Sequence, residues 1–234
     1  MQEPLTTRES IPGPIHRSPA RSGDDQTRMQ LVMSGLRLFA AEGVRGVSLR
    51  RVMLDAGAAN QSAVHYYFGN RTGLTQAVLD YVNSKLKPLQ DEALAELVEV
   101  DCEVGATVDH VVRIGLAPYI YLFNGSEEGK LCIQFLSRLT WETGAEAQAL
   151  MVSKVRPYFL KLMPYLVKAL PHKHAEALDF QFYMAAANVI HGLADIRLLS
   201  TEPGSPVDRL YRERSEDLLN YFFSYITAGL SGQV

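Results

Sequence analysis

The stretch that decides the fold spans residues 42–74 and reads EGVRGVSLRRVMLDAGAANQSAVHYYFGNRTGL. Two short helical patterns occupy it, over residues 48–56 and 61–67, and a tight turn containing Gly57 joins them. Ser48 stands where an N-cap residue begins a helix. Two short helices at this spacing are typical of a helix-turn-helix, in which the second helix enters the major groove of DNA.

Helical periodicity continues on both sides of this stretch. Apolar residues at helical spacing predict an amphipathic helix over residues 26–42, and Asn70 is placed to cap a helix that follows it. Further helices are expected near residues 86–99, 104–123, 129–140, 145–170, 174–200 and 207–229. No strand pattern competes with them, so the sequence predicts an all-α fold.

Three segments follow from these patterns. Residues 1–25 contain four prolines and show no periodicity, which predicts a disordered N-terminal arm. Residues 26–72 are expected to form a three-helix domain that contains the helix-turn-helix. Residues 73–234 are expected to form a larger helical domain.

The side chains of the helix-turn-helix suit contact with DNA. Phosphate contacts are expected from Ser48, Arg50, Arg51, Tyr67 and Arg71. Base contacts are expected from the second helix, at Gln61, Ser62, Ala63, His65 and Tyr66. Phe68, Val64, Leu74 and Leu49 are assigned to the core. Packing within the domain is an alternative role for both tyrosines, and a solvated helix face is one for Arg50 and Arg51.

The order of these features resembles the N-terminal domain of the TetR family of regulators. The resemblance covers about residues 26–80 and rests on Ser48, the Ala56-Gly57 turn, the cluster His65-Tyr66-Tyr67-Phe68 and the cap Asn70-Arg71. The segment between Gly57 and Phe68 is one residue longer than the commonest family pattern. The resemblance implies DNA binding by the first domain, and a homodimer interface and a small-molecule pocket in the larger domain.

The larger domain offers candidates for both of these sites. The expected dimer interface lies on two C-terminal apolar stripes, at Phe182, Ala185, Val189, Ile196, Leu218, Phe222 and Tyr225. The alternative is that these stripes pack only within their own chain. The expected pocket is an aromatic and methionine-rich set made of Tyr119, Tyr121, Phe123, Phe135, Trp141, Met151, Tyr158, Phe159 and Met163, with Arg138 for an acidic ligand group. Plain core is the alternative for the apolar members, and surface exposure is the alternative for Arg138.

Several classes of protein find no support in the sequence. No run of 18 apolar residues and no apolar leader occurs, so neither a membrane partner nor secretion is expected. Cys102 and Cys132 are far apart, and we expect two buried thiols in a reducing cytosol. No nucleotide-binding, hydrolase or metalloprotease motif is present, so no enzyme activity, cofactor or metal is expected.

Charge is divided unevenly along the chain. Residues 1–85 hold ten Lys and Arg against seven Asp and Glu, whereas the remainder holds 13 against 19. A positive N-terminal part is mild evidence for a polyanionic partner there. We therefore predict a cytoplasmic, sequence-specific regulator that binds double-stranded DNA, a repressor released by a small hydrophobic effector. The alternative is an all-helical carrier or interaction protein that does not bind DNA, and an activator with the same fold fits the sequence equally.

Overall fold

The computed structural model describes residues 22–58, 62–141, 145–199, 203–213 and 215–232. Every regular element within these residues is a helix, which confirms the predicted all-α class. The helices are α1 Ser22–Glu42, α2 Leu49–Asp55, α3 Ala63–Phe68, α4 Arg71–Glu103, α5 Val108–Gly125, α6 Glu127–Trp141, α7 Ala145–Lys154, α8 Arg156–Ala169, α9 Ala175–Leu199, α10 Pro206–Glu213 and α11 Ser215–Ser231.

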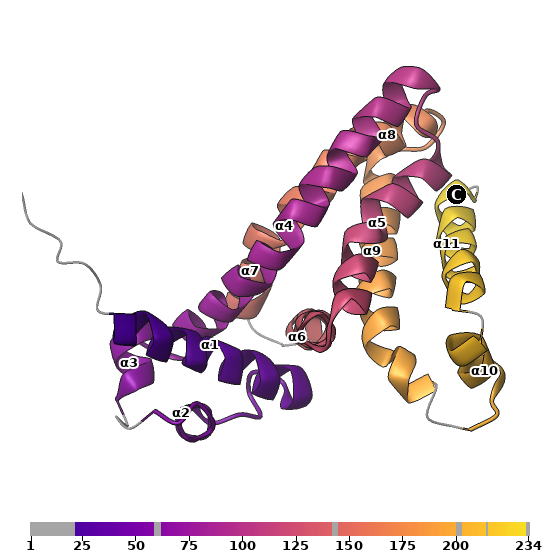
Figure 1. The fold of residues 1–234 in the computed structure, drawn as a ribbon. Helices are drawn as coiled ribbons and strands as arrows, with labels where there is room; N and C mark the ends of the chain where they lie inside the picture. The colour runs from indigo at the N-terminus through magenta and orange to yellow at the C-terminus, as the bar shows by residue number, and fades with distance from the viewer. Residues whose placement is uncertain (1–21, 59–61, 142–144, 200–202, 214, 233–234) are drawn as a thin grey trace, which may run out of the picture.

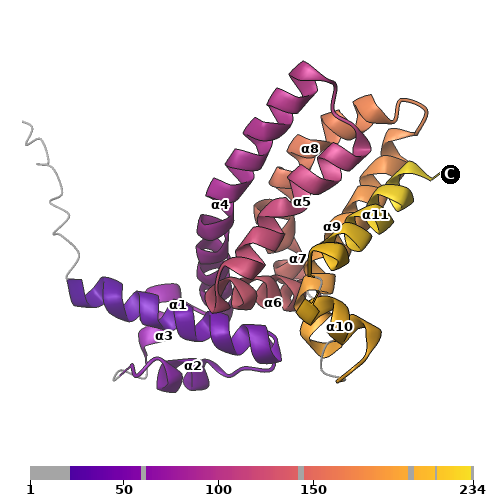
Figure 2. The same cartoon turned by 45° about the vertical axis from the view of Figure 1, so that its right-hand side comes forward.

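A small helical bundle and a larger one are joined by the long helix α4. Helices α1, α2 and α3 lie together at one end of the molecule, and α4 leads away from them along the larger bundle (Figure 1). Helix α6 lies across the base of the larger bundle and packs against α1 (Figure 2). The larger bundle therefore meets the helix-turn-helix domain in two places, through α4 and through the contact of α1 with α6.

The continuity of α4 corrects the prediction of a separate helix over residues 86–99. A single buried stripe runs along α4 at spacings of three, four and seven residues, made of Leu79, Val82, Leu86, Ala93 and Leu97. Pro88 lies inside the helix and interrupts neither the stripe nor the element. Packing of this stripe therefore outweighs the loss of one backbone donor at the proline.

Three other predicted boundaries also differ. Residues 145–170 form two helices, because the chain breaks at Val155 and Pro157 occupies the first turn of α8. A proline favours that position, where its missing N–H has no helical partner to lose. The predicted helix over 207–229 is divided into α10 and α11. Helix α1 begins at Ser22, so the last four residues assigned to the arm are helical, whereas residues 1–21 lie outside the described part.

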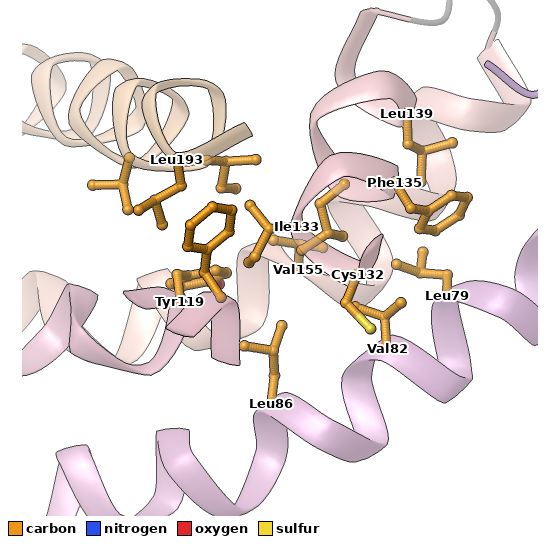
Figure 3. Packing of buried hydrophobic residues seen from close by; sticks show 14 of the residues in the cluster. Leu79, Val82, Leu86, Tyr119, Cys132, Ile133, Phe135, Leu139, Val155 and Leu193 are labelled. Carbon is orange, nitrogen blue, oxygen red and sulfur yellow. The ribbon is translucent and has the colours of Figure 1, made fainter. Parts of the chain in front are cut away.

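One apolar core extends through both bundles. Leu79 and Val82 of α4 face Cys132 and Phe135 of α6 (Figure 3). Phe135 also stacks on Phe39 of α1, with 6.4 Å between the ring centroids and 27° between the ring planes. Because Phe39 belongs to the first domain and Phe135 to the second, the two domains share this core.

Candidate nucleic-acid interface and effector cavity

The helix-turn-helix begins with a formed N-cap at Ser48. The hydroxyl oxygen of Ser48 accepts a hydrogen bond from the backbone N–H of Arg51 at 3.2 Å, which confirms the predicted start of α2. Gly57 has a φ of 64° in the turn after α2, a conformation that glycine adopts without strain. Arg51 is paired with Glu42 at 2.5 Å. Arg50 is exposed and has no ion-pair partner among the described residues.

The second helix of the motif, α3, has one buried and one exposed side. Ala63 and Val64 are buried in the core. The burial of Ala63 corrects the expectation that its methyl group meets a base. His65 and Tyr66 are exposed, and Tyr66 retains 73% of its accessible surface. Ser62 is exposed as well, whereas Gln61 lies outside the described residues.

Tyr67 contacts the protein at the position where a phosphate contact was expected. Its hydroxyl donates to Asp24 Oδ1 at 2.8 Å, which ties α3 to the first turn of α1. This hydrogen bond raises the pKa of Tyr67, with a smaller contribution from desolvation. The ring of Tyr67 also packs edge-on against Tyr66, with 4.9 Å between centroids. Tyr67 therefore positions α3.

Arg71 is likewise engaged within the domain. Its guanidinium is half-buried and donates hydrogen bonds to the backbone carbonyl oxygens of Val44 and Val47, in the loop before α2. The neighbouring Asn70 caps α4 by accepting from the backbone N–H of Gly73 at 2.9 Å, as predicted. Arg71 thus fastens the start of α4 to the loop that precedes the helix-turn-helix, and its expected role at a phosphate stays a prediction. No local sequence signal marks these carbonyls as its partners.

A cavity of about 500 Å³ lies between α6, α7, α8 and α9. Its walls are mainly apolar, and its lining includes Leu139, Thr140, Gln148, Met151, Val152, Val155, Arg156, Phe159, Met163, Asp179, Phe180, Tyr183, Ala187 and Ile190. Phe159 forms part of the apolar wall. Its ring stacks on Tyr119 at 5.6 Å and meets Phe182 edge-on at 5.8 Å. At the rim, Arg156 pairs with Asp179 at 3.2 Å.

The cavity uses only part of the predicted pocket set. Phe159, Met151 and Met163 line it. Tyr119, Phe123, Phe135 and Tyr158 are buried in the core instead, which corrects their assignment as pocket residues. Tyr121 and Arg138 are exposed and do not line the cavity, and the side chain of Trp141 lies outside the described residues.

Tyr158 has a structural role that its position in the sequence did not indicate. Its hydroxyl donates to the backbone carbonyl oxygen of Gly115 at 2.7 Å. A methyl group on Gly115 would lie only 2.8 Å from Cδ1 of Leu162, so α5 and α8 approach closely at this glycine. Burial raises the pKa of both Tyr158 and Tyr119, which keeps their hydroxyls neutral. Tyr158 is therefore a helix-packing residue.

Comparison with known proteins places the larger domain in a family. Residues 115–229 match the family model described as "Tetracyclin repressor-like, C-terminal domain". The larger domain is therefore similar to the C-terminal domain of TetR-family regulators. The matched region begins in α5 and ends in α11, whereas the resemblance found in the sequence lay over residues 26–80. Two separate parts of the chain thus indicate the same family.

One solved structure shares the fold of this chain at low sequence identity. The transcriptional regulator FadR from Bacillus subtilis, solved with stearoyl-CoA, is 12% identical with a TM-score of 0.56, and the match covers 86% of this chain and 98% of that one. A TetR-family regulator from Mesorhizobium loti is 11% identical with a TM-score of 0.45, over 90% of this chain and 98% of that one. No curated protein matches the chain.

The residues predicted for the dimer interface of this chain are divided between core and surface. Phe182, Ala185, Val189 and Ile196 are buried against their own chain, which corrects their assignment to a partner contact. Phe222 is half-buried and packs beside Gly192, and Tyr225 is exposed. The side chain of Leu218 lies outside the described residues. The apolar pattern of α9 did not include Phe180, Tyr183 and Met184, which are exposed. Tyr221 of α11 is exposed as well.

The two cysteines differ in environment. Cys132 is buried, as expected, and burial raises the pKa of its thiol to about 12. Cys102 is exposed near the end of α4, so the expectation of a buried thiol is wrong there. Among the described residues, no group of His, Cys, Asp and Glu could hold a metal ion, and no helix has the length and apolar character needed to cross a membrane.

His191 on α9 is held in one neutral form by two hydroxyls of α6. The Thr140 hydroxyl donates to the carbonyl oxygen of Ser137 at 2.7 Å, so its oxygen accepts from Nε2–H of His191 at 2.9 Å. Nδ1 then accepts from the Ser137 hydroxyl at 2.8 Å. Burial lowers the pKa of His191, although the charge of Asp195 opposes the shift.

This arrangement predicts that acid weakens the fold. Because the pKa of His191 is lower in the folded chain, the unfolded chain binds more protons as the pH falls through about 6.5. The contribution of His191 to the free energy of unfolding is therefore present at higher pH and lost in acid. Urea unfolding at pH 7.5, 6.5 and 5.5 should show wild type losing more stability than His191→Asn. His174→Asn, at an exposed histidine, is the control, and a pH-independent difference between wild type and His191→Asn would contradict the assignment.

Proposed function

We propose that this chain is a sequence-specific DNA-binding transcriptional regulator, a repressor that leaves its operator when a small hydrophobic effector occupies the α6–α9 cavity. The exposed side of α3, with His65 and Tyr66, is the observation that carries the proposal. Tyr67 braces that helix through Asp24, and Arg71 fastens the adjoining start of α4 to the loop before α2. A braced helix with an exposed polar and aromatic face suits insertion into the major groove.

Arg50 complements α3 as a contact to the DNA backbone. It is exposed beside the N-terminus of α2, and no described acidic residue neutralises it. A free arginine near a helix N-terminus suits a phosphate oxygen. We assign phosphate positioning to Arg50 and base contact to Ser62, His65 and Tyr66. Gln61 remains a further candidate for base contact.

The cavity is the proposed effector site. The FadR relative was solved with stearoyl-CoA, an acyl thioester with a long alkyl chain. Phe159, Met151, Met163 and Ile190 provide apolar walls of the kind that favour such a chain or an aromatic ring. An effector that prefers a second conformation of the protein shifts the population away from the DNA-binding form.

A second copy of the chain is the proposed partner of an exposed apolar surface on α9 and α11. We call this the α9–α11 surface and define it by Phe180, Met184, Tyr221 and Tyr225. Each helix contributes two residues four positions apart, which lie on one side of it. The two helices lie side by side in both views (Figures 1 and 2). Dimerisation through this surface would present two recognition helices to one operator.

DNA binding can be tested through the salt dependence that phosphate contacts impose. The operator is obtained by selection from a random duplex pool, and affinity is measured at several salt concentrations. We expect Arg50→Ala to weaken binding and to reduce the slope of log affinity against log salt by about one. Tyr66→Ala should weaken binding to the selected site more than to random duplex.

The matched control is Arg209→Ala, at an exposed arginine of α10 far along the chain from the helix-turn-helix. Its affinity and salt slope should equal those of wild type. If wild type binds no duplex, or binds without any salt slope, the carrier or interaction protein without DNA becomes the better assignment.

A further inference from the structure

Helix α7 touches both the cavity and the start of α4. Its residues Gln148, Met151 and Val152 line the cavity. Glu146 accepts a hydrogen bond from the hydroxyl of Thr72 in the first turn of α4. At 100° per residue, Glu146 lies on the opposite side of α7 from the three cavity residues. One short helix therefore has a cavity side and an α4 side.

The α4 side of α7 is held by polar contacts at both ends. Besides the bond between Thr72 and Glu146, Lys154 forms an ion pair with Asp80 at 2.7 Å. The side-chain amide of Asn83 donates to the backbone carbonyl oxygen of Lys154 at 3.4 Å. These contacts span residues 72–83 of α4.

Helix α7 is also the cavity wall that packing holds least firmly. No residue of α7 is buried. Helix α6, by comparison, contributes Cys132, Ile133, Phe135 and Leu136 to the core, and all four are fully buried. Moving α6 would disrupt dense packing, whereas moving α7 costs a few half-exposed contacts. An occupant that needs more room therefore displaces α7 first.

Displacement of α7 acts where the helix-turn-helix is fastened. Thr72 directly follows Arg71, whose guanidinium holds the loop carbonyls of Val44 and Val47, and Asn70, which caps α4. We propose that the Glu146–Thr72 hydrogen bond transmits occupancy of the cavity to the recognition helix, with Glu146 and Thr72 as positioning residues. This inference rests on the proposed function and adds the contacts through which the effector would regulate DNA binding.

The test measures how far dye binding changes DNA affinity. If the Glu146–Thr72 hydrogen bond only supported the fold, removing it would leave that change as it is in wild type. Nile red, a neutral lipophilic dye, serves as the cavity probe, and affinity for the selected operator is measured with and without saturating dye. In wild type we expect the dye to lower DNA affinity about tenfold, within the usual range of allosteric coupling. The single variants Thr72→Val and Glu146→Ala should each bind the dye alone and DNA alone as wild type does. Saturating dye should lower their DNA affinity by less than about threefold.

Lys168→Met is the matched control, because it breaks an ion pair of 2.8 Å between α8 and Asp101 near the other end of α4. It should keep the full dye effect. If the dye does not enter the cavity, Met163→Trp fills it with a side chain, and operator affinity is compared with and without Thr72→Val, after circular dichroism shows the helical fold.

Equal losses in wild type and Thr72→Val would overturn the route through α7 while leaving DNA binding intact. The route would also be overturned if the dye leaves the DNA affinity of wild type unchanged and Met163→Trp binds DNA as wild type does. Absence of operator binding in every variant would instead be the failure of the proposed function, on which the route depends.

Discussion

Replacing Phe135 with alanine is expected to lower the free energy of unfolding by about 3–5 kcal/mol. Phe135 is fully buried on α6 and stacks on Phe39 of α1. Its removal leaves a cavity where the two domains share their core, and rigid neighbours such as Leu79 close such a space only in part (Figure 3). Equilibrium denaturation in urea, followed by circular dichroism, measures the loss.

A double-mutant cycle separates the ring pair from general burial. Phe39→Ala and Phe135→Ala together should cost less than the sum of the single variants, with a coupling of about 0.5–1.5 kcal/mol. Tyr121→Ala, at an exposed aromatic residue of α5, is the control and should change stability by less than about 0.5 kcal/mol. A loss below about 1 kcal/mol in Phe135→Ala would contradict the shared core.

The helix-turn-helix was predictable because its signals are local. Ser48 and Asn70 cap the helices that follow them, and each capping bond spans only three residues. Gly57 marks the turn for an equally local reason, since its positive φ suits glycine. Such features depend only on neighbouring residues in the sequence, so they can be predicted without the folded structure.

The roles of Tyr67 and Arg71 could not be predicted in this way. Tyr67 bonds a residue 43 positions away, and Arg71 bonds carbonyls 27 and 24 positions away. Only the folded chain brings these groups together. Both side chains also have the chemistry of a phosphate contact, so residue type alone does not reveal their partners within the chain. The missed break before α8 is different, because Pro157 was a visible signal.

The residues of the cavity and of the exposed α9–α11 surface were predicted only in part, for a third reason. Helical periodicity identifies an apolar stripe but does not say what covers it. On α9, the stripe containing Val189 is covered by the chain itself, whereas Phe180 and Met184 on another side remain exposed. The same ambiguity placed Tyr119 in the pocket, although only its neighbour Phe159 reaches the cavity wall.

The second large effect is expected at the α9–α11 surface. The double variant Met184→Glu, Tyr225→Glu should be monomeric in sedimentation experiments at concentrations where wild type is dimeric. Met184 and Tyr225 are 44% and 64% exposed in the single chain, so glutamate is solvated in the monomer and the fold is retained. In a dimer the same four carboxylates of two copies would be buried without partners, which is strongly unfavourable.

Loss of the dimer should lower operator affinity by about a hundredfold or more, because the two half-sites are no longer bound as a linked pair. Affinity for a single half-site should stay close to that of wild type, since α2 and α3 are untouched. Val98→Glu, at an exposed apolar residue of α4, is the control and should remain dimeric. A double variant that still sediments as a dimer would exclude this surface, and the partner contact would then have to be sought on another face of the larger domain.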